Sequence, residues 1–245
     1  MSVYKITEIQ LKDYIRCPIF YRIKYDNNRI SVDDPLSMNK LLNQIATGFC
    51  VSLMDGIVIS PDKLKRKWDM LINRYPDYIN SVRARDGLGK LYQFYRWAEV
   101  NQLRIADIGS EYIIPIDDEN GNRIEYHGSL GIISANINND PENLIIDFSN
   151  RYPDQADLDL QLKTTLDHIG FQLLYKCKLA GTRVHNVKGD RDFFTTRDNA
   201  MLLGKVKTII KNVVTALKQN IWYPNESPLC QSCTVRDFCL GYGIK

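Results

Sequence analysis

Cysteines near both ends of the chain constrain how it can fold. Cys17 stands in the run CPIFY, and three more cysteines stand in CQSCTVRDFC at residues 230–239. A C-x2-C turn places two thiolates on one ion, and a third thiolate after a five-residue spacer can close the same face. Cys17, beside a proline at a predicted helix end, is the natural fourth ligand. A shared centre would hold the two ends of the chain together.

Four thiolates fit either of two centres, Zn²⁺ in a structural site or an iron–sulfur cluster. The residues by themselves leave both open. The predicted ligands are Cys17, Cys230, Cys233 and Cys239. The two other cysteines, Cys50 and Cys177, lie in apolar helical patterns and are predicted to be small buried hydrophobic residues.

Several features predict a cytoplasmic protein with no membrane association. The start MSVYKITEIQ lacks the charged-then-apolar order of a signal peptide. Apolar runs such as Ile57–Ile59 and Leu144–Ile146 are far too short to span a bilayer. In a reducing compartment, six cysteines indicate metal or redox chemistry more than a disulfide framework.

Charge is distributed unevenly along the 245 residues, although the net charge is only +3. Residues 1–106 carry a net +6 and residues 161–245 a net +7, whereas residues 107–160 carry a net −10. Basic ends around an acidic middle are typical of a protein that meets a polyanion, although solvated faces would look the same. The basic residues expected to contact nucleic acid, interleaved with aromatics in the first segment, are Arg16, Arg22, Lys24, Lys65, Arg66 and Lys67.

The order of predicted elements indicates an α/β fold. Helices are expected over 5–25 (broken at Cys17-Pro18), 36–54, 60–75, 87–103, 157–181 and 198–220. Strands are expected over 105–117, 122–137 and 143–149 as one meander, with one or two more in 182–196. We therefore predict three regions: a helical N-terminal region 1–104, an α/β core 105–220, and a C-terminal cysteine segment 221–245.

The two cysteine runs, with their flanking YIRCPIFYRIKY and YPNESPLCQSCTVRDFC, resemble the iron–sulfur branch of the RecB-type PD-(D/E)xK nuclease superfamily. This branch includes CRISPR-adaptation nucleases and AddB-like nuclease subunits. The resemblance implies a restriction-endonuclease-like core, with a mixed central sheet flanked by helices. It also implies a [4Fe–4S] cluster on Cys17, Cys230, Cys233 and Cys239 that staples the chain ends, with Zn²⁺ as the alternative.

The catalytic motifs of that family are degenerate here. Asp147 in LIIDFSN matches the metal-binding acid, but Ser149 stands where the family has its lysine. The upstream Gly-x-x-Asp motif would place its acid at Gly131 or at Ser134, depending on which glycine is matched. Glu111 is a second vestigial acid. No histidine stands in ATGFCVSL, and Gln172 and Tyr175 are three apart where the family has four.

One carboxylate holds Mg²⁺ poorly, so we expect the active site to be lost while the fold is kept. The predicted function is that of a catalytically inactive, cluster-bearing protein of DNA replication, recombination or repair. It would bind single-stranded or duplex DNA, a replication or recombination protein, or both. The alternative is an active Mg²⁺- or Mn²⁺-dependent nuclease with rearranged ligands: Glu111, Asp147 and one of Asp154, Asp157 or Asp159. A zinc-stapled interaction protein is the third possibility.

Overall fold

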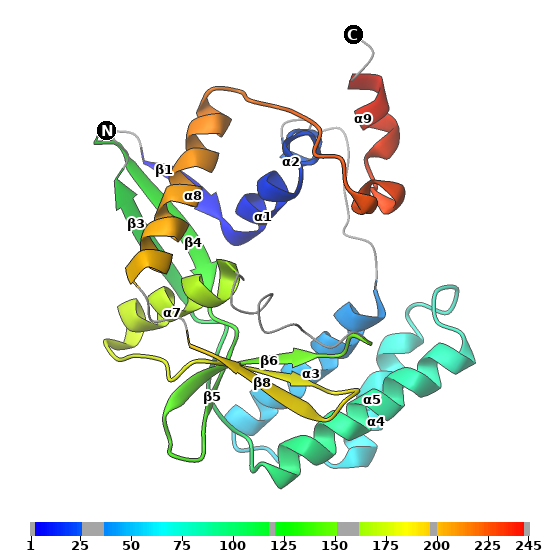
Figure 1. Cartoon of the computed structure of the whole chain (residues 1–245). Helices are drawn as coiled ribbons and strands as arrows, with labels where there is room; N and C mark the ends of the chain where they lie inside the picture. The colour runs from blue at the N-terminus through cyan, green and yellow to red at the C-terminus, as the bar shows by residue number, and fades with distance from the viewer. Residues whose placement is uncertain (1–2, 26–36, 118–120, 151–161, 197–199, 243–245) are drawn as a thin grey trace. The chain divides into compact units, whose positions relative to one another are not determined.

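The structure is a computed structural model that describes residues 3–25, 37–117, 121–150, 162–196 and 200–242. The chain forms two compact units (Figure 1). The terminal unit comprises Met1–Pro35, Ile113–Gly128 and Leu203–Lys245, and the central unit comprises Leu36–Tyr112 and Ser129–Leu202. Within the described ranges, every helix is too short or too polar to cross a membrane.

A mixed five-stranded sheet organises the central unit, in the order β2-β5-β6-β7-β8. Only β6 and β7 run parallel, and the other neighbours are antiparallel. The connection between β6 and β7 contains α7 (Leu162–Tyr175), as a parallel pair requires a crossover. The strands are β2 (Arg104–Ile108), β5 (Ile132–Ala135), β6 (Pro141–Asp147), β7 (Thr182–Asn186) and β8 (Arg191–Thr195).

Helices lie on both faces of this sheet (Figure 1). Leu144, Ile146 and Phe148 alternate onto one face, where they pack in a core with residues of α3 (Met38–Met54), α4 (Pro61–Ile72) and α5 (Ser81–Val100). The residues between them, such as Asn143, face α7, whose Asp167 accepts a hydrogen bond from the Asn143 amide. A sheet covered on both faces explains why the residues of β6 are buried or half-buried throughout.

The helices begin where local chemistry predicts. Ser60 caps α4 by accepting a hydrogen bond from Lys63 N (3.3 Å), with Pro61 at the first helical position. Trp68 of α4 is buried against α5 and donates its indole N–H to Ala84 O (3.0 Å). Gly87 of α5 makes this close approach possible, because a Cβ at that position would lie 2.5 Å from the Trp68 ring.

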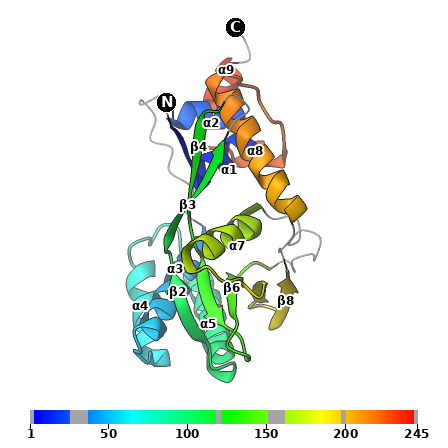
Figure 2. The same ribbon diagram turned by 90° about the vertical axis from the view of Figure 1, so that its left-hand side faces the viewer.

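A three-stranded sheet in the order β1-β4-β3 organises the terminal unit. Its strands are β1 (Tyr4–Thr7), β3 (Glu111–Asp117) and β4 (Arg123–Ser129), with β1 and β4 parallel. Alternate residues of β3 are buried, as expected for a sheet with one covered face. Figure 2 places α8 (Ala200–Lys218) along this sheet, and Lys218 lies over the Tyr4 ring.

The remaining elements of the terminal unit come from the two ends of the chain. Helices α1 (Glu8–Arg16) and α2 (Pro18–Tyr25) are separated by Cys17, as the Cys-Pro pair predicts. The C-terminal segment contains a short 3₁₀ helix, η1 (Pro228–Ser232), and α9 (Arg236–Tyr242). Helix α9 lies beside both η1 and α2.

The mixed α/β class is confirmed, whereas the predicted meander is wrong. Each of the runs 105–117 and 122–137 contains two strands, and these strands divide between the two sheets. Gly109, with φ +77°, turns the chain between β2 and β3. Residues 4–7 form β1 in place of the start of a helix, and α7 ends at Tyr175, before the predicted Gly181.

Substituting Gly87 with Ala should destabilise the protein by about 1–3 kcal/mol, because the buried Trp68 ring cannot move away. Gly89, two residues along α5, has nothing within 4 Å of an added Cβ. Gly89→Ala is therefore the matched control and should stabilise the helix by about 0.5–1 kcal/mol. Urea unfolding of both variants measures the difference. Equal unfolding midpoints would contradict the packing described for α4 and α5.

Candidate metal centre

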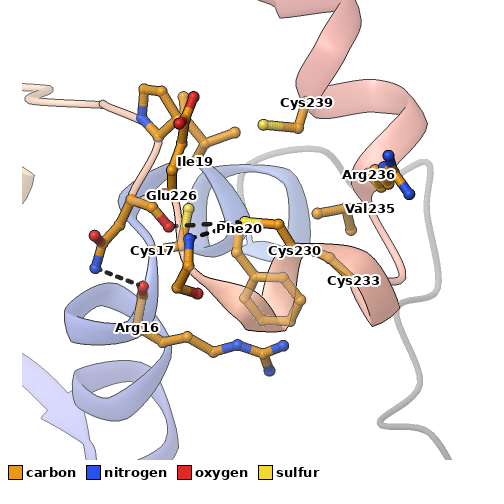
Figure 3. A pocket seen from close by; sticks show the side chains of 13 residues that line it. Arg16, Cys17, Ile19, Phe20, Glu226, Cys230, Cys233, Val235, Arg236 and Cys239 are labelled. Carbon is orange, nitrogen blue, oxygen red and sulfur yellow. Dashed lines mark hydrogen bonds between the residues drawn. The ribbon is translucent and has the colours of Figure 1, made fainter.

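The four predicted ligands line one pocket of about 310 Å³ in the terminal unit (Figure 3). Cys17 reaches it from the junction of α1 and α2, Cys230 from η1, Cys233 from the end of η1, and Cys239 from α9. Thiols more than 200 residues apart in sequence therefore face one cavity. Cys50 and Cys177 are not among the residues that line it.

Local backbone geometry directs these thiols. Cys17 caps α1 with an extended backbone, and its N–H donates to Asp13 O (3.0 Å). The Cys230 sulfur accepts a hydrogen bond from Ser227 N at 3.4 Å and lies 3.9 Å from Asn225 O. Turns of this kind, with backbone N–H groups pointing at sulfur, orient a thiolate for a metal.

Aromatic packing holds the C-terminal segment against α1 and α2. Trp222 stacks on Tyr21 (6.0 Å between ring centroids) and meets Tyr14 edge-on (6.1 Å). Tyr14 Oη donates to Ile221 O (2.9 Å), and Asn225 Nδ2 donates to Arg16 O (3.0 Å). Such aromatic pairs stabilise by about 0.5–1.5 kcal/mol beyond the area they bury.

Beneath the pocket, Val235 packs in a small apolar core, with Ile19, Phe20 and Ile23 of α2. The Cys17, Cys233 and Cys239 side chains lie against this core. The pocket therefore has an apolar floor, which lowers the local dielectric and makes the negative charges of neighbouring thiolates felt more strongly.

The thiols act on one another electrostatically. Burial raises the pKa of the Cys239 thiol, and the negative charges of Cys17, Cys233 and Cys230 raise that pKa further. Arg16 and Arg236 also line the pocket and supply positive charge beside the sulfurs. A cation bound among the thiols would remove their mutual repulsion.

The four described thiols share the pocket without forming a recognisable metal-binding group. Among the described residues, no group of three or more His, Cys, Asp or Glu side chains has an arrangement that could hold a metal ion. The donor set itself, four thiols on one cavity, fits a soft metal centre.

The remaining two cysteines differ from each other. Cys50 is fully buried in the core of the central unit, as predicted, and burial raises its pKa to about 12. The prediction for Cys177 is wrong, because this residue is exposed. It lies just beyond the end of α7, in a segment whose apolar pattern suggested a longer helix.

Asp147, the predicted vestigial acid, ends β6 in the central unit, and its carboxylate is engaged within the protein. It accepts hydrogen bonds from Ser149 N (2.9 Å), Ser149 Oγ (3.0 Å) and Asn186 Nδ2 (2.8 Å). Ser149, at the lysine position of the family motif, thus binds the acid it follows. Asn186 lies opposite Asp147 in the parallel β6–β7 pair and is buried.

The strand register bears on the two frames of the Gly-x-x-Asp motif. Ile132 pairs with Leu144, so position 131 lies toward the Asp147 end of the strand pair. Ser134 pairs instead with Glu142, five residues before Asp147. Two acids that share one metal must lie close together, which favours the frame that ends at Gly131. A Cβ at Gly131 would lie 3.1 Å from Asn143 Oδ1.

The other motif residues lie apart from Asp147. Glu111 is exposed at the first position of β3. Tyr175 Oη donates to Asp107 Oδ2 (2.6 Å), which fixes the end of α7 to β2. The acidic residues of the displaced-site hypothesis, Asp154, Asp157 and Asp159, lie outside the described residues.

Sequence reasoning missed two buried acids of the central unit. Glu142 pairs with Arg183 (Nε to Oε1, 2.9 Å), and burial raises its pKa against the opposing effects of Arg183 and Ser134. Asp167 accepts from Tyr112 Oη (3.2 Å) and from Lys163 Nζ. Glu142 was not predicted to be a buried strand residue because the surrounding DPEN has the composition of a turn. The Lys-x-x-x-Asp spacing in α7 is the signal that could have identified Asp167.

The predicted nucleic-acid residues have different surroundings. Lys24 pairs with Asp13 (2.9 Å) and Lys65 with Asp69 (2.6 Å). Arg16 lies over Phe20 and Arg22 over Trp222, so both stack on rings of the terminal unit. Arg66 is exposed, and Lys67 lines a depression of about 250 Å³ on α3 and α4, together with Arg74.

Comparison with known proteins gives no family. No protein-family description and no curated protein matches the chain. Among solved structures, the chain is similar to the crystal structure of SSO0001, with a TM-score of 0.44 and 12% sequence identity. The match covers 97% of this chain and 86% of that one.

Replacing Asp147 with Ala should lower the free energy of unfolding by about 1–3 kcal/mol, because the buried Asn186 amide loses its 2.8 Å hydrogen bond to the carboxylate. The exposed Asp77, in a turn after α4, provides a control. Asp77→Ala should change stability by no more than about 0.5 kcal/mol. Chemical denaturation measures both. If the two variants were equally stable, the Asp147 carboxylate would not stabilise the end of the β6–β7 strand pair.

Proposed function

We propose that this chain is an iron–sulfur, nuclease-like protein that binds DNA without cleaving it. The observation that carries the proposal is the convergence of Cys17, Cys230, Cys233 and Cys239 on one pocket. The cysteine spacing that predicts these four ligands does not specify how the two ends of the chain pack. The four cysteines nevertheless line one cavity, which supports a common ligand.

The size of the pocket favours a cluster over a single ion. A Zn²⁺ ion with bonds of about 2.3 Å to sulfur would require the sulfurs to lie about 3.8 Å apart. The cavity of about 310 Å³ is larger than one such ion needs and leaves room among the thiols for a multi-atom cluster. Zinc stays the alternative, since it uses the same ligand types.

In this proposal, the four thiolates hold a [4Fe–4S] cluster that cross-links the ends of the terminal unit. The cluster supplies covalent staples between α1–α2 and the C-terminal segment. Arg16 and Arg236 balance the negative charge of the thiolates, and Ser227 N orients the Cys230 sulfur. The aromatic contacts of Trp222 hold the same two segments together, so cluster and packing reinforce each other.

The central unit supports the nuclease-like part of the proposal. Its mixed sheet has helices on both faces, which is the architecture that the resemblance implies. Catalysis is proposed to be lost for two reasons. Gly131 supplies no carboxylate near Asp147, and Asp147 itself is bound by Ser149 and Asn186. A metal ion would have to displace both partners of a lone acid.

The depression on α3 and α4 is the proposed site of phosphate contact. Lys67 of α4 and Arg74, in the turn just after α4, line it together with Gln44 of α3. Both cations therefore border the same depression. Lysine and arginine side chains that neutralise phosphates account for most of the sequence-independent affinity for DNA.

Anaerobically purified protein should contain iron and acid-labile sulfide and absorb visible light. Cys17→Ala should lose the cluster and lower the melting temperature, since metal binding and folding are coupled. Cys177→Ala, at an exposed cysteine away from the pocket, should keep both. Metal analysis and thermal melts measure these effects.

Two results would contradict the cluster assignment. Zinc without iron or sulfide would mean a zinc staple, and a Cys17→Ala protein with unchanged cluster content would remove Cys17 from the ligands. Cys230→Ser serves as the second variant, in case Cys17→Ala fails to fold.

The second candidate function, an active nuclease with rearranged ligands, is favoured only by the acidic content of residues 107–160. A labelled DNA strand incubated with the protein and Mn²⁺ should stay intact. Cleavage that disappears in Asp147→Ala would overturn the loss of catalysis and establish the second candidate.

Charge removal at the depression should weaken DNA binding. Lys67→Gln combined with Arg74→Gln should lower affinity for duplex DNA, and should reduce the salt dependence of log K by about 1 per lost phosphate contact. The control is Lys205→Gln with Lys207→Gln on α8, which removes the same charge. Fluorescence anisotropy at several salt concentrations provides the comparison. A larger loss in the control pair would assign the phosphate contacts to α8.

A further inference from the structure

A second pocket lies in the central unit, between the C-terminal half of α5 and the β7–β8 turn, and nothing above uses it. Its volume is about 420 Å³, within the range of small-molecule sites. Helix α5 contributes Tyr92, Gln93, Arg96, Trp97, Val100 and Asn101, and the turn contributes Val187, Lys188 and Asp190.

Two cations of this pocket have no described ionic partner. No ion pair or hydrogen bond joins the Arg96 or Lys188 side chain to another described residue, and both residues are exposed. Lys24 and Lys65, in contrast, are each paired with an aspartate. Asp190, at the far end of the turn, is one negative charge against these two positive charges, so the net charge of the lining is positive. The pocket therefore favours an anionic group beside the two cations.

The aromatic wall of the pocket is rigid on one side and open on the other. Trp97 is nearly buried and stacks on His185, with ring centroids 4.0 Å apart and an interplanar angle of 16°. Tyr92, five residues earlier in α5, is 37% exposed and offers an open aromatic surface. A planar ring entering the pocket can stack there without rearranging the core.

Hydrogen bonds fix the β7–β8 turn before any ligand arrives. Asn186 donates to the Asp147 carboxylate and accepts from Gly189 N (3.0 Å). Val187 N donates to Asp147 O (3.0 Å), at the carboxyl ends of the parallel β6–β7 pair. Asp147 therefore serves as the anchor that positions the turn bearing Lys188. A site fixed in advance loses little entropy when it binds.

From these features we infer that the pocket binds one nucleotide unit of a single-stranded nucleic acid. Arg96 and Lys188 contact the phosphate, and the base stacks on Tyr92. Stacking platforms combined with cations are how proteins hold single strands without sequence preference. A base paired within a duplex cannot enter, so the pocket prefers single strands. The inference rests on the nucleic-acid binding proposed above, and it adds the strand type and a second contact site.

The test uses the full-length protein and a fluorescein-labelled 15-nucleotide oligothymidylate. Arg96→Gln with Lys188→Gln should reduce the salt dependence of log K by about 0.7, because the one phosphate that both cations contact is no longer neutralised. Tyr92→Leu should weaken binding by about five-fold or more at constant salt, because it removes a stacking surface. Neither change should alter the affinity for duplex DNA of the same length by more than about two-fold.

A charge-matched control is Arg85→Gln with Lys205→Gln, which are exposed residues outside this pocket. The control should bind the oligonucleotide as the wild type does. Titration with thymidine monophosphate distinguishes a free nucleotide from a strand, and binding as tight as that of the oligonucleotide would overturn the strand assignment.

Failure of this inference is distinguishable from failure of the proposed function. Wild-type protein that binds duplex DNA, with oligonucleotide binding unchanged in all three pocket substitutions, would overturn the nucleotide site and leave the proposed phosphate contacts of Lys67 and Arg74 unaffected. A protein that binds neither form would overturn the DNA part of both proposals, while its iron content would still test the cluster.

Discussion

The contact between the two chain ends is the constraint on which the terminal unit depends. Trp222 packs against Tyr14 and Tyr21, and backbone acceptors at Arg16 and Ile221 receive hydrogen bonds across the same junction. These interactions do not involve sulfur. Aromatic packing thus brings Cys17 to the C-terminal cysteines, and the pocket they share is a consequence of that packing.

Asp147 of the central unit lies where catalytic acids are often found, but its hydrogen bonds are those of a residue that stabilises the fold. Asp147 ends the parallel strand pair, where the carboxyl ends of strands commonly form binding sites. Its oxygens are satisfied by Ser149 and Asn186, which connect it to the β7–β8 turn. This carboxylate positions a loop through its contacts with Ser149 and Asn186.

Parts of this arrangement could be predicted because they depend on short-range chemistry. Cys17-Pro18 ends one helix and begins the next, and Ser60-Pro61 begins another. The strands were harder to predict, because periodicity does not say which sheet a strand joins. The runs 105–117 and 122–137 each divide between two sheets, with pairing set by partners distant in sequence. Glu142 is a buried strand residue, although the surrounding DPEN has the composition of a turn.

The sequence by itself determined the four thiols, their spacing, the mixed α/β class and the Ser149 that follows Asp147. Those properties follow from residue identity and from neighbours a few positions away. Only the tertiary structure decided that the thiols face one cavity, that Cys177 is exposed, and that Arg96 and Lys188 share a pocket with Tyr92. These features depend on contacts between distant segments, whose energies come from packing and not from local propensity.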